Sequence, residues 1–285
     1  MKQIDQRSDL EAEEFVEEYL HKNKPVVLKN AAPYWRERWT PQWLKQQFGD
    51  REIVVETGED FVEDRSRKTI TLAELIDSVL GESMEFRVRN MKFLSQVTEL
   101  QNEWQEHNQS ESYLRGAVSP KRAFWVVPNG NATALHHDHF YDNMNVQIFG
   151  RKHFILMPPS SYKSVYAHLF SESRVDPRRV SHDEFPRFAG VDLSETMVEP
   201  GDVIFIPQFW WHFVASIGLC INVNSWVKAP RRAVRKVTSQ IPLVPRYFYQ
   251  VYYMDSIHQM ITRNIMKVHR LTTLFGRGKA QPAGQ

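Results

Sequence analysis

Between residues 113 and 228 the sequence alternates between short runs of β-branched and aromatic residues and clusters of turn residues. Pro128-Asn129-Gly130 follows one such run, and Pro200-Gly201 precedes another. The expected strands are 124–127, 145–149, 153–157, 203–206 and 213–227, the last interrupted at Gly218. Short strands at this spacing are typical of a barrel or a sandwich. A block of roughly a hundred residues also fits the usual size of a two-layered β domain, so the sequence predicts a mainly β core.

The first 112 residues have the pattern of helices with a few strands. Capping residues predict three helix starts, which are Ser8 with Glu11, Thr40 before Pro41, and Thr71 with Glu74. Apolar residues at helical spacing follow each start, and the first helix is expected to end near Asn23. Residues 26–28 and 53–55 are expected strands. Helices therefore flank the predicted β core on its N-terminal side.

The chain from residue 229 to 285 differs again in pattern. It starts with a basic stretch from Lys228 to Lys236, and a helix with apolar residues three or four positions apart is expected after Pro245. That apolar face would pack on the protein's own core, which we favour, or form a homodimer contact. From Gly276 the sequence is expected to be disordered. Three parts are thus predicted, at 1–112, 113–228 and 229–285.

Charge and cysteine content exclude several classes of protein. The chain has 36 Lys and Arg against 34 Asp and Glu, a net charge of +2, which excludes a dedicated nucleic-acid coat or a strongly acidic tail. A single cysteine, Cys220, excludes an intramolecular disulfide framework and a CxxC site. The N-terminus lacks the pattern of a signal peptide, and no run reaches the roughly 18 apolar residues of a membrane span. We therefore expect a cytoplasmic protein that does not associate with membranes.

Residues 133–139 (TALHHDH) contain the most informative pattern in the chain. Side chains alternate along a strand, so His136 and Asp138 would point to one side, with His137 and His139 on the other. Two histidines and one carboxylate form the facial triad that holds non-heme Fe(II) and leaves positions open. His212 is the best candidate for the third ligand, because it follows a strand that a Pro-Gly turn introduces. Surface histidines also form such clusters by chance, so the pattern needs support.

Polar residues within apolar strands give that support. A buried Lys152 would hold a carboxylate-bearing co-substrate, although an exposed lysine at a strand edge is the better explanation when the residue is taken alone. Asn143 and Asn224 lie among apolar residues, where a polar side chain is costly without a partner. A bound ligand would supply partners for both.

These residues stand in an ordered series of motifs. The series is 130–138 (GNATALHHD), 143–152 (NMNVQIFGRK), 157–159 (MPP), 200–207 (PGDVIFIP), 210–212 (WWH) and 224–226 (NSW). It resembles the JmjC/cupin-like family of Fe(II)- and 2-oxoglutarate-dependent oxygenases, in particular the hydroxylase branch that includes the asparaginyl hydroxylase inhibiting hypoxia-inducible factor. The resemblance covers about residues 10 to 228, with 25–30 (PVVLKN) and 39–44 (WTPQWL) included. It implies a double-stranded β-helix, the jelly-roll or cupin fold, with flanking helices.

The resemblance also implies roles for single residues. His136, Asp138 and His212 would hold the iron and carry the catalysis. The co-substrate 2-oxoglutarate would bind to five further residues, which are Tyr113, Thr133, Asn143, Lys152 and Asn224. Tyr113 rests only on the short phrase 112–114, and a core tyrosine is the alternative. The interval from His136 to Gly150 is one residue longer than in the asparaginyl hydroxylase, so Asn145 is a rival to Asn143.

The implied activity is hydroxylation of a C–H bond with O2, accompanied by conversion of 2-oxoglutarate to succinate and CO2. A protein or peptide side chain is the favoured substrate. A small molecule or a tRNA base is the enzyme alternative, and the stretch from Lys228 to Lys236 would contact phosphate or an acidic polypeptide if it is not simply solvated. A metal-binding cupin without turnover is the alternative from another class.

Overall fold

A computed structural model of the chain describes residues 1–57, 66–81, 97–108, 110–113, 121–168 and 171–228. They lie in one compact unit that spans residues 1–240. The expected helix after Pro245, its homodimer face and the expected disorder from Gly276 lie outside the described residues. Within the described ranges, no helix has the length and apolar character needed to cross a bilayer.

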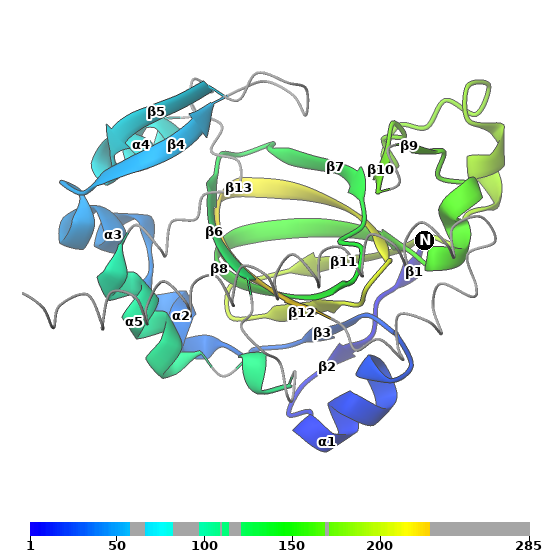
Figure 1. Cartoon of the computed structure of the whole chain (residues 1–285), viewed down its shortest axis with the longest axis horizontal. Coiled ribbons are helices and arrows are strands. Elements are labelled where there is room, and N and C mark those ends of the chain that lie inside the picture. The colour runs from blue at the N-terminus through cyan, green and yellow to red at the C-terminus, as the bar shows by residue number, and fades with distance from the viewer. Residues whose placement is uncertain (58–65, 82–96, 109, 114–120, 169–170, 229–285) are drawn as a thin grey trace, which may run out of the picture. The chain divides into compact units, whose positions relative to one another are not determined.

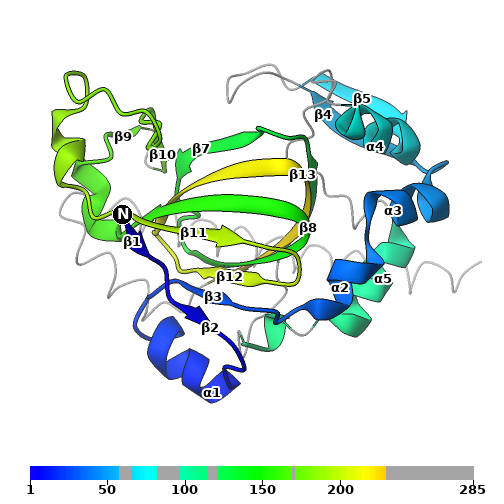
Figure 2. The ribbon, with the colours of Figure 1, turned by 180° about the vertical axis from the view of Figure 1, so that it is seen from behind.

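Within these ranges, eleven strands form one curved sheet, and Figures 1 and 2 show its central strands surrounding a common interior. The central strands are β6 (Lys121–Val127), β7 (Ala132–His136), β8 (Tyr141–Met157), β11 (Ser194–Val198), β12 (Val203–Ile206) and β13 (Trp211–Lys228). Strands β8 and β13 pair along nearly their whole length, from Trp211 opposite Met157 to Lys228 opposite Tyr141. On its other edge β8 pairs with β11 and β12, and β13 pairs with β6 and β7. The predicted mainly β fold with a jelly-roll core is confirmed.

Strand β8 corrects the expectation of two separate strands at 145–149 and 153–157. The strand runs through Gly150, whose φ is +69°. A Cβ atom at this position would lie 2.0 Å from the carbonyl oxygen of Leu219, so only glycine fits. Gly218 has a φ of +75°, and the pairing of β13 with β8 shifts register between Ile217 and Ile221. These glycines mark bends within strands rather than strand ends.

The N-terminal part contributes to the same sheet. Strands β1 (Lys2–Gln3) and β2 (Gln6–Arg7) pair with β11 and with β3 (Val26–Leu28), which itself pairs antiparallel with β12. The short strands β9 (Ala167–His168) and β10 (Glu172–Ser173) extend the opposite side through β7. A separate hairpin joins β4 (Glu52–Thr57) to β5 (Ser66–Thr71). The part expected at 1–112 is thus joined to the β core by the pairing of β3 with β12.

Five α-helices and four other helical segments accompany the described strands. They are α1 (Ala12–Phe15), the π-helix η1 (Val16–Leu20), α2 (Pro33–Arg38), α3 (Pro41–Phe48), α4 (Leu72–Leu80), α5 (Thr98–His107), η3 (Ser110–Tyr113), η4 (Pro159–Lys163) and η5 (Pro186–Gly190). Two predicted caps are confirmed, because Thr40 accepts from the Trp43 amide and Thr71 forms a full capping box. The expected box at Ser8 is wrong, since α1 begins after Glu11 without a side-chain cap.

A cluster of tryptophans fastens the helices to the barrel. The rings of Trp39 and Trp104 lie 4.5 and 4.8 Å from the ring of Trp35, measured between centroids, and all three are almost fully buried. Trp39 also packs edge-on against Phe124 of β6, at 5.5 Å. Aromatic side chains bury large apolar areas, so these contacts fix β6 against the helices. Strand β6 in turn pairs with the part of β13 that carries Asn224.

Candidate functional site

The histidines of the predicted triad come together at the end of the barrel where β7 and β13 meet. His136 is the last residue of β7, and its Cα pairs with that of His212 on β13. Residues opposite each other in an antiparallel pair project to the same face, and the two imidazole centroids lie 4.2 Å apart. Asp138 follows β7 directly, and its carboxylate lies 3.8 Å from Nε2 of His136 and 3.6 Å from Nε2 of His212.

Backbone carbonyls orient both rings toward this carboxylate. Nδ1 of His136 donates to the carbonyl of Ala134 at 2.8 Å, and Nδ1 of His212 donates to that of Trp210 at 3.0 Å. Each carbonyl can only accept, so Nδ1 is the donor and Nε2 is the ring nitrogen that faces Asp138. A carbonyl that accepts the Nδ1 proton holds a histidine ring in place as a metal ligand through Nε2.

The electrostatics of the cluster also suit a cation. Burial lowers the pKa of His136 to about 4, so its imidazole is neutral at pH 7. Burial alone would raise the pKa of Asp138, but the facing histidines, with hydrogen bonds from Trp226 and Asn143, keep it below its usual value. One ligand atom from each of the three residues lies within 4.8 Å of the others. Two imidazole nitrogens and one carboxylate fit the donor set of a non-heme Fe(II) site.

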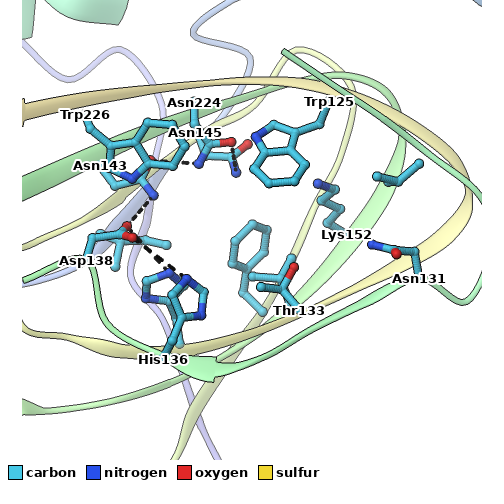
Figure 3. Close-up of a pocket in the computed structure, with 15 residues that line it drawn as sticks. Trp125, Asn131, Thr133, His136, Asp138, Asn143, Asn145, Lys152, Asn224 and Trp226 are labelled. Atoms are coloured by element: carbon cyan, nitrogen blue, oxygen red, sulfur yellow. Dashed lines mark hydrogen bonds and ion pairs between the residues drawn. The ribbon is translucent and has the colours of Figure 1, made fainter. Parts of the chain in front are cut away.

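The triad lines one cavity together with most of the other predicted residues, as Figure 3 shows. Seven of the eight predicted site residues line it, namely Thr133, His136, Asp138, Asn143, Lys152, His212 and Asn224. Asn145, the rival to Asn143, lines it too. Asn143 is the residue that contacts Asp138, because its Nδ2 donates to Oδ2 at 2.8 Å. Asn145 instead donates to Oδ1 of Asn224 at 3.1 Å.

Lys152 lies on the cavity wall with only 7% of its surface exposed. Its Nζ donates to Oδ1 of Asn222, and no carboxylate of the described residues forms an ion pair with it. Burial lowers the pKa of this ammonium to about 8. A buried cation without an anionic partner is costly, and a carboxylate-bearing ligand in the cavity would relieve that cost.

Tyr113 is the predicted residue that the structure does not bring to the cavity. Its hydroxyl donates to the carbonyl of Leu10 at 3.1 Å, and its ring packs against Phe15 with 5.3 Å between centroids. This is the alternative of a core tyrosine. Tyr113 therefore lies outside the residues that line the cavity.

The two remaining histidines of the segment, His137 and His139, do not line the cavity. The ring of His137 is 3% exposed and stands perpendicular to that of Trp211, with centroids 4.7 Å apart. Its Nδ1 accepts the backbone N–H of His139, which has a φ of +52°. This hydrogen bond and the left-handed backbone shape the turn after Asp138.

Sequence reasoning gave no role to Trp125, Trp226 or Asn222, which contact this site. Trp125 lines the cavity, Trp226 lines it and hydrogen-bonds to Asp138, and Asn222 contacts Lys152. Asn222 and Trp226 stand two residues to either side of Asn224, so strand alternation places all three on one face. That spacing is the signal that would have identified them.

Comparison with known proteins agrees with this geometry. The family model described as a cupin-like domain matches residues 11–232. Lysine-specific demethylase JMJ30 of Arabidopsis thaliana is 26% identical over 79% of this chain and 54% of its own length. Lysine-specific demethylase 8 of Danio rerio is 27% identical over 75% of this chain and 55% of its own length. This chain thus spans about half the length of these two relatives.

A third relative is matched over more of its length. The human bifunctional peptidase and (3S)-lysyl hydroxylase JMJD7 is 21% identical over 74% of this chain and 79% of its own length. The cupin-like match covers all the strands that surround the cavity and all the residues proposed to line it. The chain therefore belongs to the JmjC/cupin-like family of Fe(II)- and 2-oxoglutarate-dependent oxygenases.

Proposed function

We propose that this protein is an oxygenase that uses Fe(II), 2-oxoglutarate and O2 to hydroxylate a C–H bond on a protein side chain. One observation carries the proposal, namely that the triad and the buried Lys152 line the same cavity. A binding-only cupin needs a metal site, but it does not need open metal positions together with an anchor for a carboxylate. The donor set leaves room for ligands other than protein, and Lys152 offers a counter-charge for one of them.

Each residue has a role in this proposal. Nε2 of His136, Nε2 of His212 and the Asp138 carboxylate hold the iron. Lys152 pairs with the distal carboxylate of 2-oxoglutarate, and the Thr133 hydroxyl lies on the same cavity wall as a further donor. Asn143 and Asn224 line the cavity between the anchor and the metal. Asn143 donates to the Asp138 carboxylate, and Asn224 donates to Asn143.

The protein's own contribution is orientation and exclusion of water. When bound, iron and 2-oxoglutarate supply the oxidising power, and the co-substrate leaves as succinate and CO2. The strands β7, β8 and β13 hold the ligands on rigid backbone, which limits how far each can move. His212 is 3% exposed, so bulk water has little access to that side of the centre.

A protein substrate is supported by the names of the relatives. The demethylases and JMJD7 are all named for action on lysine. JMJD7 is the reported relative whose own length is best covered, at 79%, and its name includes a lysyl hydroxylase. Direct hydroxylation, rather than demethylation, is therefore the outcome that we propose.

Anaerobic titration of the purified protein with Fe(II) and then 2-oxoglutarate tests the site. We expect a visible metal-to-ligand charge-transfer band in the wild type, and its loss or weakening in His212→Ala and Lys152→Ala. His153→Ala and Arg151→Ala are matched controls, because His153 pairs with Glu195 on β11 and Arg151 is exposed. If the wild type binds iron but not 2-oxoglutarate, the oxygenase proposal is wrong.

A screen for succinate release then tests the substrate. Peptides, metabolites and tRNA are incubated with the iron-loaded protein, and each product is identified by mass spectrometry. Gain of one oxygen atom on a peptide supports the proposal. Release of formaldehyde from a methylated peptide would indicate demethylation instead. Turnover confined to a metabolite or tRNA would contradict the protein substrate.

A further inference from the structure

Three asparagine side chains connect the anchor lysine to the metal-binding carboxylate. Lys152 Nζ donates to Oδ1 of Asn222, and Nδ2 of Asn222 donates to Oδ1 of Asn224 at 2.7 Å. Nδ2 of Asn224 donates to Oδ1 of Asn143 at 3.0 Å, and Nδ2 of Asn143 donates to Oδ2 of Asp138 at 2.8 Å. An unbroken chain of four hydrogen bonds thus spans the cavity wall from the cation to the carboxylate.

The two ends of the chain fix the orientation of every amide in it. An ammonium only donates and an ionised carboxylate only accepts. Asn222 must therefore turn its oxygen to Lys152 and its nitrogen to Asn224, and each following amide repeats that order. All the donors point from Lys152 toward Asp138, so each amide dipole favours both charges. Hydrogen bonds aligned in this way strengthen one another.

Strand register places the amides on one face. Asn224 pairs with Asn145 across β13 and β8, while Asn222 pairs with Gln147 on β8 and with Trp125 on β6. Asn222 is fully buried. The second hydrogen on its Nδ2 goes to Oδ1 of Asn145 at 3.2 Å, so its donors and its acceptor are all used. A buried amide costs free energy unless it is paired in this way.

We propose that Asn222 is a positioning residue for the co-substrate, because its Oδ1 holds the Lys152 ammonium at a set place on the cavity wall. This inference rests on the proposed function, in which Lys152 receives the distal carboxylate of 2-oxoglutarate. Asn222 is the one hydrogen-bond acceptor for Nζ among the described residues, which leaves two N–H groups for that carboxylate. The amide chain then sets the distance from the anchor to Asp138, and so the length of dicarboxylate that fits.

Two variants of Asn222 separate this role from a general structural one. Asn222→Leu keeps the approximate volume and removes the acceptor, so Lys152 should lose its proton more readily. Asn222→Asp keeps the acceptor and adds a negative charge, so Lys152 should hold its proton more tightly. Cys220 on β13 is the titratable group that already acts on this ammonium, and it is unchanged in both variants. A purely structural asparagine would not move the lysine titration in opposite directions.

The first measurement is a pH titration of Lys152 in the full chain without iron or 2-oxoglutarate. The titration is monitored by NMR of ¹³Cε-labelled lysine. Lys152→Met assigns the signal. We expect a lower titration midpoint in Asn222→Leu and a higher one in Asn222→Asp. Asn131→Leu is the matched control, since Asn131 also lines the cavity and its side chain makes no hydrogen bond to Lys152. Its midpoint should equal that of the wild type.

The second measurement is the affinity of the Fe(II)-loaded protein for 2-oxoglutarate, read from the charge-transfer band. Both Asn222 variants should bind 2-oxoglutarate about tenfold more weakly, with unchanged Fe(II) affinity and, in turnover, a raised KM with kcat nearly unchanged. If Asn222→Leu does not fold, Asn222→Asp decides alone, because it retains the size and the acceptor. Unchanged midpoints and affinities would overturn the inference. If the midpoints of the two variants shift in opposite directions but the wild type binds no 2-oxoglutarate, the contact between Asn222 and Lys152 is supported and the proposed function is contradicted.

Discussion

The two ends of the cavity are built in different ways. At the metal end, each histidine is oriented by a carbonyl two residues earlier, in Ala134 and in Trp210. The contacts within each strand are therefore local, and only the pairing of β7 with β13 is needed to bring the rings together. At the anchor end, Lys152 depends on Asn222, which lies 70 residues away in the sequence.

The two ends also differ in charge balance. The Asp138 carboxylate faces two imidazoles and accepts hydrogen bonds from Asn143 and Trp226, so its charge is well supported before any metal binds. The Lys152 ammonium is buried with one neutral acceptor among the described residues. The metal end is thus stable as it stands, whereas the anchor end gains most from its ligand. Of the two ends, we therefore expect only the anchor end to gain stability when its charge is removed while it loses affinity for its ligand.

The largest effect is expected from Asp138→Ala. Outer-shell substitutions at metal sites cost roughly 10 to 100-fold in affinity, so loss of a ligand should exceed about 100-fold. The variant also removes the charge that both histidines face. Isothermal titration with Fe(II) under anaerobic conditions measures the loss, with His153→Ala as the control on the outer side of β8. Fe(II) affinity within tenfold of the wild type would contradict the assignment of Asp138.

Lys152→Met should have the next largest effect, and it should separate binding from stability. Charge-assisted hydrogen bonds contribute about 1.5–3 kcal/mol, so 2-oxoglutarate affinity should fall roughly 10 to 100-fold. Iron affinity should not change. Because the variant removes a buried cation that has no carboxylate partner among the described residues, the ligand-free protein should melt at a higher temperature than the wild type. A lower Tm together with unchanged 2-oxoglutarate binding would show that Lys152 stabilises the protein and does not bind the co-substrate, which contradicts the difference drawn between the two ends.

A smaller effect is expected from pH. Burial lowers the pKa of Lys152 to about 8, so the ligand-free ammonium loses its proton above that pH. Affinity for 2-oxoglutarate should therefore be constant below pH 8 and fall as the pH rises, by up to about tenfold per unit. The stability of the folded protein should change in the opposite direction. A lysine pKa that is lowered in the folded state destabilises that state most below pH 8, and this destabilisation decreases as the pH rises. Charge-transfer titrations between pH 7 and 9 test this dependence, and Lys152→Met should abolish it.

Local patterns in the sequence predicted that His136, Asp138 and His212 lie together, as they do in the structure. Alternation placed His136 beside Asp138, and the turn at Pro200-Gly201 predicted a strand that returns His212 to them. Capping by Thr40 and Thr71 was likewise readable, because a cap depends on residues three positions apart. These features depend on neighbouring residues or on one strand pairing.

The anchor end could be predicted only in part, because it depends on long-range register. Lys152, Asn143 and Asn224 were identified by polarity and resemblance, but the contact of Lys152 with Asn222 requires the pairing of β8 with β13. That pairing shifts register between Ile217 and Ile221, and alternation along one strand cannot predict such a shift. The contact of Tyr113 is also long-range, since its hydroxyl donates to the carbonyl of Leu10, about a hundred residues earlier.

The smallest effect on the cavity is expected at Asp142, a second buried ionisable group on β8. It precedes Asn143 in the strand, so its side chain points to the face opposite the cavity. Its Oδ1 accepts the backbone N–H of Gln208 at 3.0 Å, and burial raises its pKa to about 7. Asp142 thus resembles Lys152 as a buried charge, but it does not line the cavity where a ligand could balance that charge.

Asp142→Asn should therefore change stability and leave 2-oxoglutarate binding unchanged. The folded pKa lies above the ordinary value of 3.8, so the carboxyl group favours folding most below about pH 4 and loses that contribution as the pH rises to 7. Asparagine keeps an acceptor for Gln208 and cannot ionise, so the variant should gain stability over the wild type at pH 8 and none at pH 4. Urea unfolding at both pH values measures the difference. An equal difference in unfolding free energy at pH 4 and pH 8 would show that Asp142 is not held neutral. Weakened 2-oxoglutarate binding would show that the two faces of β8 are not independent.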